Sequence, residues 1–162
     1  MSESFDFDRP GRFTVGALGE PGQRVFFFQT FADGTEVAVK CEKQQAQALA
    51  QHLVKLLDDL PASGSEPVAP AEALPPADLS WVVGSISIGV DRTEERVLVM
   101  LEELIDPDEG DADPAQLRLR LTAQQVQAYA AQVDALVSTS RPVCRLCEHP
   151  IDPAGHACPR LN

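Results

Sequence analysis

Three cysteines and a histidine near the C-terminus have the residue types and the spacing of a metal site. Cys144 and Cys147 form a CxxC pair, and His156 and Cys158 follow after an interval of eight residues. Three thiolates and one imidazole are the ligand set that tetrahedral structural zinc prefers. Four protein ligands leave no open position for water, so the spacing predicts a structural Zn²⁺ site rather than a catalytic one.

His149 is a second candidate for the nitrogen ligand because it lies two residues after Cys147. A site built on His149 would leave His156 without a role beside Cys158, so we favour His156 and keep His149 open. Residues 141–162 contain few apolar side chains. We therefore expect metal binding to order this tail.

The charge balance argues against nucleic acid as a partner. The 162 residues include 25 acidic and 13 basic side chains, which gives a formal net charge of -12. A surface with this charge repels phosphate backbones. No apolar stretch approaches the ~18 residues of a membrane span, and the first residues lack the pattern of a signal peptide. We expect a cytoplasmic protein that binds neither nucleic acid nor membranes.

The elements that carry the tail are predicted from apolar periodicity, and they form the same series twice. In residues 1–60 the series is three strands at 12–18, 24–30 and 36–41, with turns at 19–22 and 33–34, and a helix at 43–60. In residues 81–140 it is three strands at 82–90, 96–102 and 116–121, and a helix. Thr122 opens this second helix, and Gln125 is its capping-box partner.

The two halves align at one constant offset from their third strands onward, which places Val37 on Leu117. The identities at this offset are Gln44, Gln45, Gln47, Ala48, Ala50 and Leu56 with Gln124, Gln125, Gln127, Ala128, Ala130 and Leu136. The sequence therefore predicts an internal duplication. We expect an α+β fold in which two βββα pseudo-repeats form a mostly antiparallel sheet packed by two helices, with a C-terminal zinc-binding knuckle.

Residues 61–80 separate the halves and contain five prolines, a composition that predicts a mobile linker. Trp81 follows at the start of a strand and is interpreted as a core anchor rather than a platform for a ligand. Phe26, Phe27 and Phe28 make both faces of their strand apolar. Either this strand is central, or one of its faces meets a partner.

Two further sets of polar residues, an acidic loop and His52, are interpreted as surface features rather than as functional sites. The acidic residues between the last two strands predict a solvated loop, because glycine does not occupy the sixth position that a calcium loop requires. They are Asp106, Asp108, Glu109, Asp111 and Asp113. His52 lies on the first helix with no nucleophile placed beside it by a known signature, so we expect a helix surface residue.

Several segments resemble an actinobacterial family of uncharacterised repeat proteins, the domain of unknown function 3090. They are FDFDRPGRF at 5–13, GEPGQRVFF at 19–27, RPVCRLC at 141–147 and HACPRLN at 156–162. The resemblance implies no activity, but its tail pattern falls on the same four metal ligands. It also implies genomic neighbours that resemble a phosphoglycerate mutase and a kinase. Glu148 stands where the family pattern has glycine, which leaves the turn after Cys147 open.

No catalytic constellation emerges from these residues, so we expect a non-enzymatic adaptor module that binds a protein partner. The alternative is an enzyme or ligand-binding protein that acts on a phosphorylated metabolite. Its site would be formed by cations at outward positions of neighbouring strands. These cations are Arg12, Arg24, Lys40, Arg96, Arg118 and Arg120.

Overall fold

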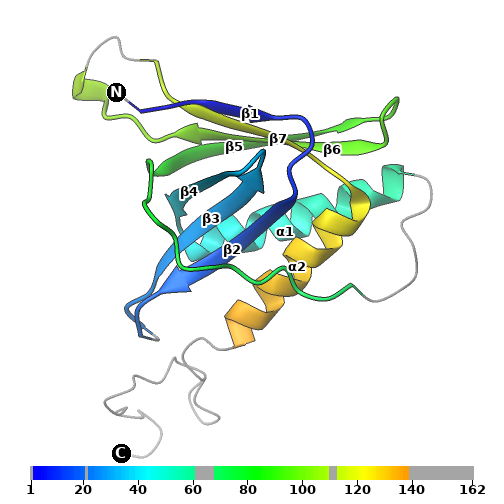
Figure 1. Ribbon diagram of the computed structural model, residues 1–162, viewed down its shortest axis with the longest axis horizontal. Helices are drawn as coiled ribbons and strands as arrows, with labels where there is room; N and C mark the ends of the chain where they lie inside the picture. Colours follow the sequence, from blue (N-terminus) through cyan, green and yellow to red (C-terminus); the bar gives the residue numbers. More distant parts are fainter. Residues whose placement is uncertain (1, 21, 61–67, 110–112, 139–162) are drawn as a thin grey trace, which may run out of the picture.

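The computed structural model describes residues 2–20, 22–60, 68–109 and 113–138 (Figure 1). Its strands are β1 (Phe5–Phe7), β2 (Arg12–Leu18), β3 (Val25–Ala32), β4 (Thr35–Cys41), β5 (Val83–Asp91), β6 (Arg96–Glu103) and β7 (Gln116–Leu121). Its helices are α1 (Lys43–Leu56) and α2 (Ala123–Ser138), and η1 (Leu57–Asp59) and η2 (Pro107–Glu109) are short 3₁₀ turns. This order confirms the predicted α+β class, with the three predicted strands before each helix and one further short strand, β1, that the sequence did not predict.

The strands form two sheets, whereas the sequence predicted one. β2, β3 and β4 form an antiparallel sheet, and the second sheet has the order β1-β7-β6-β5, with only β1 and β7 parallel. The sheets stay separate because a short segment of chain occupies the outer edge of each third strand. β1 lies beside β7, and Trp81 lies beside β4, where its backbone O accepts a 2.8 Å hydrogen bond from the backbone N of Lys40.

Tight turns fix the register of the first sheet. The β2–β3 connection contains Gly19 and Gly22 with φ of 96° and 92°, and the β3–β4 turn contains Asp33 and Gly34 with φ of 53° and 76°. Glycine adopts positive φ without a steric penalty, and Asp tolerates it better than most residues. Both turns lie where the sequence predicted them.

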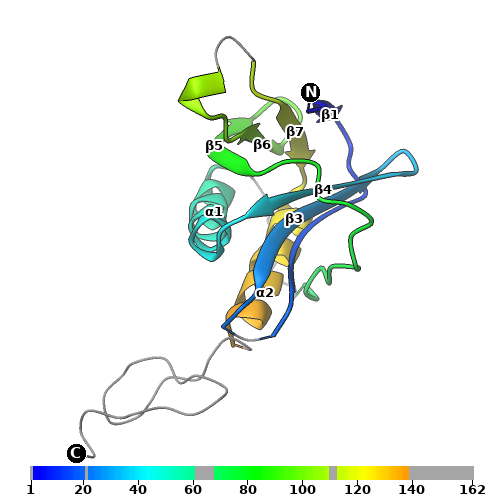
Figure 2. The same cartoon turned by 90° about the vertical axis from the view of Figure 1, so that its left-hand side faces the viewer.

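One core joins the inner faces of both sheets to the two helices, which pack against each other (Figure 2). At its centre, the Phe13 ring lies 5.7 Å from Phe28 and 5.0 Å from Tyr129, between ring centroids. Trp81 is buried, and its indole N–H donates to the backbone O of Glu3 at 3.0 Å. The interpretation of Trp81 as a core anchor is confirmed.

The two helices begin in the same way, and each is tied to the other half of the chain. The N-terminal amide of each capping box donates to a glutamine side chain, Glu42 N to Gln45 Oε1 and Thr122 N to Gln125 Oε1. Gln45 Nε2 then donates to Val83 O at 3.3 Å. Gln125, its counterpart in the second half, donates in the same manner to the backbone O of Pro10 at 2.7 Å. The capping box predicted at the second helix is confirmed.

Residues 68–80 lie against the protein, although their composition predicted a mobile linker. The part from 71 to 80, which we call the strap, crosses the outer face of the β2-β3-β4 sheet. Gln29 anchors it, because Nε2 of this buried side chain donates to Leu74 O at 3.0 Å and Oε1 accepts from Leu74 N at 2.9 Å. Ser80 N donates to Ala38 O at 2.8 Å at the far end. Hydrogen bonds from side chains and backbone of the sheet thus hold the strap, whose Leu74 side chain is exposed and adds little burial.

The strap also explains the run of three phenylalanines. β3 is the central strand of its sheet, so Phe28 faces the helices while Phe27 faces the strap, and both are buried. Of the two alternatives left open by the sequence, the central strand is correct.

Candidate functional site

The predicted zinc ligands lie outside the described residues. Cys144, Cys147, His156 and Cys158, together with the rival His149, fall in 139–162. Within the described ranges, no group of three or more His, Cys, Asp or Glu side chains is arranged to hold a metal ion. The metal site therefore stays a prediction from sequence.

The six cations considered for an anion site do not come together. Arg12 and Lys40 lie in the three-stranded sheet and Arg24 just before β3, whereas Arg96, Arg118 and Arg120 lie in the four-stranded sheet. Arg12 is further occupied by the strap, since its Nη1 donates to Glu72 O at 2.9 Å. The convergence into one pocket that the alternative function requires is therefore not found, because it assumed a single sheet.

The two sets of three strands nevertheless match in register. Residues that lie side by side on neighbouring strands form a row across each sheet. The row of Val15, Phe28 and Val39 in the first sheet corresponds to the row of Ile88, Val99 and Leu119 in the second. The sequence alignment of the two halves also pairs Val39 with Leu119. The rows on either side of these face outward, away from the helices. Thr14, Gln29 and Ala38 correspond to Ser87, Met100 and Arg118. Gly16, Phe27 and Lys40 correspond to Gly89, Leu98 and Arg120. Each outward position of one sheet therefore has a counterpart on the other.

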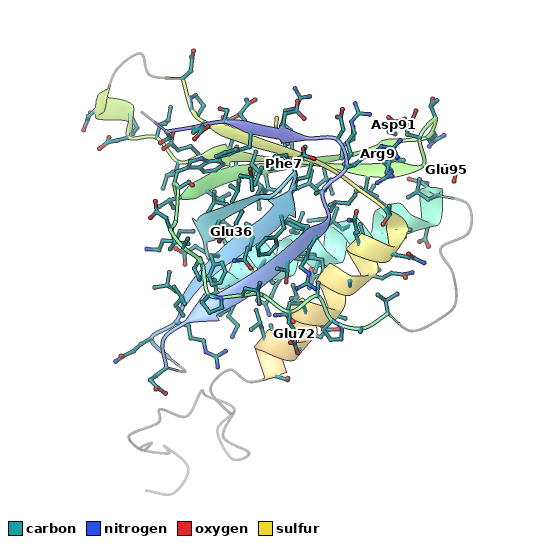
Figure 3. All side chains as sticks on the ribbon, viewed as in Figure 1. Phe7, Arg9, Glu36, Glu72, Asp91 and Glu95 are labelled. Carbon is teal, nitrogen blue, oxygen red and sulfur yellow. The ribbon has the colours of Figure 1, made fainter. Side chains whose placement is uncertain are left out.

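These counterpart faces differ in what covers them. The strap covers Thr14, Gln29 and Phe27, which are buried. On the four-stranded sheet, we call Ser87, Gly89, Leu98, Met100, Arg118 and Arg120 the open face. The helices and the other sheet lie on its opposite side, and no described element lies over it (Figures 1 and 3). A hollow of about 370 Å³ forms there.

The two arginines of the open face, Arg118 and Arg120, differ in their ion pairs. Nη1 of Arg120 lies 3.1 Å from Asp91 Oδ2, and its Nε lies 3.5 Å from Asp8 Oδ1. These pairs are solvent-exposed, so each contributes little stability, but together they engage Arg120. Arg118 is exposed and forms no ion pair with any residue that the structure describes. Arg118 is thus the cation of this face that is not engaged by an ion pair, although Asp6, its partner in the register of β1 and β7, lines the same hollow.

A second hollow lies at the edge of the same sheet. β5 is the last strand of the order β1-β7-β6-β5, and no charged residue occurs between Val83 and Val90. Between β5 and α1 is a groove of about 310 Å³, lined by Gln45, Ala48, Leu49, His52, Gly84, Ile86 and Ile88. His52 is exposed, as the sequence predicted.

The corresponding groove between α2 and β2 is partly filled, and a hollow of about 420 Å³ remains between β2, the strap and the C-terminal half of α2. Nε2 of the buried Gln132 donates to Val15 O at 3.0 Å, which satisfies the edge of β2. The backbone N of Ala71, in the strap, donates to Ala128 O at 3.1 Å. In the alignment of the two halves, Ala128 and Gln132 correspond to Ala48 and His52, which line the unoccupied groove.

The titratable groups buried in the core are held neutral. Burial raises the pKa of the Cys41 thiol to about 12, and the neighbouring Glu42 adds to the shift. Burial also raises the pKa of Tyr129, whose hydroxyl donates to Ala46 O at 2.8 Å. A thiol with so high a pKa carries almost no thiolate at neutral pH, so Cys41 is a packing residue and not a nucleophile.

Comparison with known sequences assigns the chain to a family. Residues 5–158 match the family described as protein of unknown function, DUF3090. The chain belongs to this family. The matched range ends at Cys158 and so includes all four predicted zinc ligands of this DUF3090 member. No curated protein and no solved structure matches it. Among its described helices, none is long and apolar enough to cross a membrane.

Sequence reasoning missed the open face of the DUF3090 member and its relation to the strap. The available signal was a glycine inside each of two strands, at positions 16 and 89. Glycine weakens a strand, so it often marks a place where another backbone approaches closely. At Gly16 the strap approaches closely, because an added Cβ would lie 2.6 Å from the Cβ of Ala73, and the Phe27 ring is equally close.

Proposed function

We propose that this protein is a non-enzymatic adaptor whose open face binds a protein partner. The observation that carries the proposal is the contrast between matched faces. One is covered by the chain's own strap, and the other leaves the half-buried Leu98 and Met100 beside the exposed Arg118 in a hollow that no described residue covers. Apolar side chains next to an exposed arginine are typical of protein-binding surfaces.

We further propose that the two βββα units are copies of one ancestral unit. The matched strand registers support this duplication, and so do the glutamines at positions 45 and 125, each of which caps its own helix and binds the other unit. In this proposal the two copies have diverged. The first has its outer face closed by the strap, and the second uses its outer face for binding.

The tail is proposed to carry a structural Zn²⁺ held by Cys144, Cys147, His156 and Cys158. The donor set supports zinc, since three thiolates and one imidazole complete a closed tetrahedral site. The metal would supply folding free energy to a segment with few apolar residues, and no chemical step is assigned to it. The tail follows α2 directly in sequence, so it would extend the body as a second presenting surface.

The contacts favour a protein partner over a phosphorylated metabolite. Tight phosphate binding needs several converging donors that are not already neutralised. Here the cations are divided between two sheets, and Arg120 is engaged by Asp8 and Asp91.

Quantitative affinity capture from cells that naturally contain the protein tests this function. The wild-type chain, a Met100→Asp/Arg118→Glu variant and a control variant serve as baits. Val54→Asp is the matched control, because Val54 is an exposed apolar residue on α1, away from the open face. We expect at least one protein to be captured by the wild type and the control and to be depleted about tenfold with the double variant. Identical captures by all three baits would contradict the proposal.

A further inference from the structure

We infer that the open face binds an extended segment of the partner that contains proline and alanine, along the path that the strap takes over the matched sheet. This inference rests on the proposed function and names the chemistry of its partner. The strap itself is such a segment, with Pro75 and Pro76 at its middle. Prolines favour an extended backbone that crosses strands without pairing with them.

Gly89 is the first evidence for this path. Its counterpart Gly16 is required because an added Cβ would lie 2.6 Å from both the Cβ of Ala73 in the strap and the ring of Phe27. At Gly89 an added Cβ would meet only Leu98 Cδ1, at 3.9 Å, which is an ordinary contact. No neighbour in the described part of the chain therefore requires a glycine in the middle of β5. A backbone lying on the open face, as the strap lies on Gly16, would require it.

The route onto the face is the second evidence. Over the first sheet, the strap begins in the groove between α2 and β2, where Ala71 N donates to Ala128 O. The matched groove between α1 and β5 is unoccupied by described residues and is lined by Ala48, the counterpart of Ala128. The groove and the hollow of the open face adjoin the same strand, β5, and share Ile88 in their linings. An extended chain can enter by the groove and continue across β5.

The side chains of the face set the chemistry of the occupant. Ser87 corresponds to Thr14, whose hydroxyl donates to Ala71 O of the strap, so a hydroxyl is again placed to donate to a backbone carbonyl. Met100 and Leu98 replace Gln29 and Phe27 and provide an apolar floor for alanine and proline side chains. Arg118 replaces Ala38 and, with Asp6 and Asp8 of the same hollow, adds charged groups that can bind polar groups of the segment.

A peptide with the sequence of the strap tests the inference on the full-length protein. Fluorescein-labelled peptide 71–80 is titrated with the intact chain, and binding is followed by fluorescence anisotropy. We expect saturable binding that weakens about tenfold or more in Gly89→Val and in Arg118→Glu, each loss being about 1.4 kcal/mol or more. Arg92→Glu, in the exposed β5–β6 turn, is the matched charge control and should bind normally.

Three outcomes would overturn the inference. The first is that the peptide does not bind. The second is that binding is lost in Gln29→Leu and kept in Gly89→Val, which would mean that the peptide replaces the strap on the first sheet. The third is concentration-dependent dimerisation of the chain that Gly89→Val abolishes, which would assign the face to a second copy. Affinity capture by the Met100→Asp/Arg118→Glu bait separates these failures from a failure of the proposed function, since it detects a partner of any chemistry at this face.

Discussion

Replacing Gln29 by leucine tests how the strap is held. The Gln29 amide makes two hydrogen bonds with the backbone of Leu74 and one, of 3.1 Å, with Glu36 Oε1. Leucine has a similar size but offers no polar atom. If the strap stays in place, two backbone groups of Leu74 lose their partners, at a cost of about 1–3 kcal/mol each.

The strap can instead lift from the sheet. In that case Phe27, now 2% exposed, returns to water at a cost of about 2 kcal/mol, and the bonds from Thr14 and to Glu36 are lost as well. The variant adopts whichever of the two states, strap bound or strap lifted, has the lower free energy. We therefore expect the free energy of unfolding to fall by about 2–3 kcal/mol.

Urea denaturation measures this loss, and hydrogen exchange at the Leu74 amide shows which route is taken. Gln51→Leu, the same substitution at an exposed position of α1, should change the free energy of unfolding by less than about 0.5 kcal/mol. A Gln29→Leu variant as stable as this control, with the Leu74 amide still protected, would refute the account of the strap.

Three other predictions concern the glycines, the core thiol and the tail. Gly16→Ala should destabilise the fold by about 1–3 kcal/mol, because its Cβ overlaps the strap, whereas Gly89→Ala should be neutral or stabilising in thermal unfolding. Equal losses would contradict the matched faces. Because the folded-state pKa of Cys41 is raised from 9.0 to about 12, the folded chain keeps a proton that the unfolded chain releases above pH 9. Stability should therefore fall by about 1.4 kcal/mol per pH unit from this group, and urea titrations at pH 8–10.5 should show a shallower fall in Cys41→Ala. An unchanged slope would contradict the burial argument. Elemental mass spectrometry should find about one zinc per chain, lost in Cys144→Ser/Cys147→Ser with the helical circular dichroism retained. Metal-free wild-type protein with freely titratable thiols would exclude the zinc site.

The local elements were predictable because each has a local cause. The βββα order, the turn at Gly34 and the capping box at Thr122 follow from periodicity and from turn and cap chemistry over a few residues. The burial of Trp81 also followed, since an isolated large aromatic at a strand start has few other roles in a folded body.

The division into two sheets was not predictable, because it depends on which chain segment reaches the outer edges of β4 and β7. Those contacts join residues far apart in sequence, and alternation within a strand carries no information about them. The prediction that the strap is mobile was wrong for a related reason. Its composition is dominated by proline, alanine and polar residues, and its order comes from Gln29 and Thr14, which belong to another part of the chain.

The candidate site was missed in part for the same reason. Arg118 and Arg120 were identified as outward cations, but the alternative function grouped them with the cations of the other half. Only the register of the strands shows that Met100 stands where the first sheet has Gln29, and that Gly89 stands where it has Gly16.

The edges of the two sheets support the same assignment. Exposed strand edges attract other chains, and proteins usually shorten, charge or cover them. β1 has only three residues, α2 covers β2, and Trp81–Val82 covers part of β4. Of the described edges, the nine-residue β5 is the one that is long and, as far as Val90, without charge. It borders both the groove and the open face.

Site-specific photo-crosslinking in living cells is the most direct test of the central claim, that the open face binds a protein. A photoreactive amino acid at position 98, within the face, is compared with one at position 54, on the exposed surface of α1. The account predicts a discrete crosslinked partner at position 98 that is absent at position 54 and disappears when Arg118→Glu is added. No crosslink at position 98, or the same products from both positions, would contradict it.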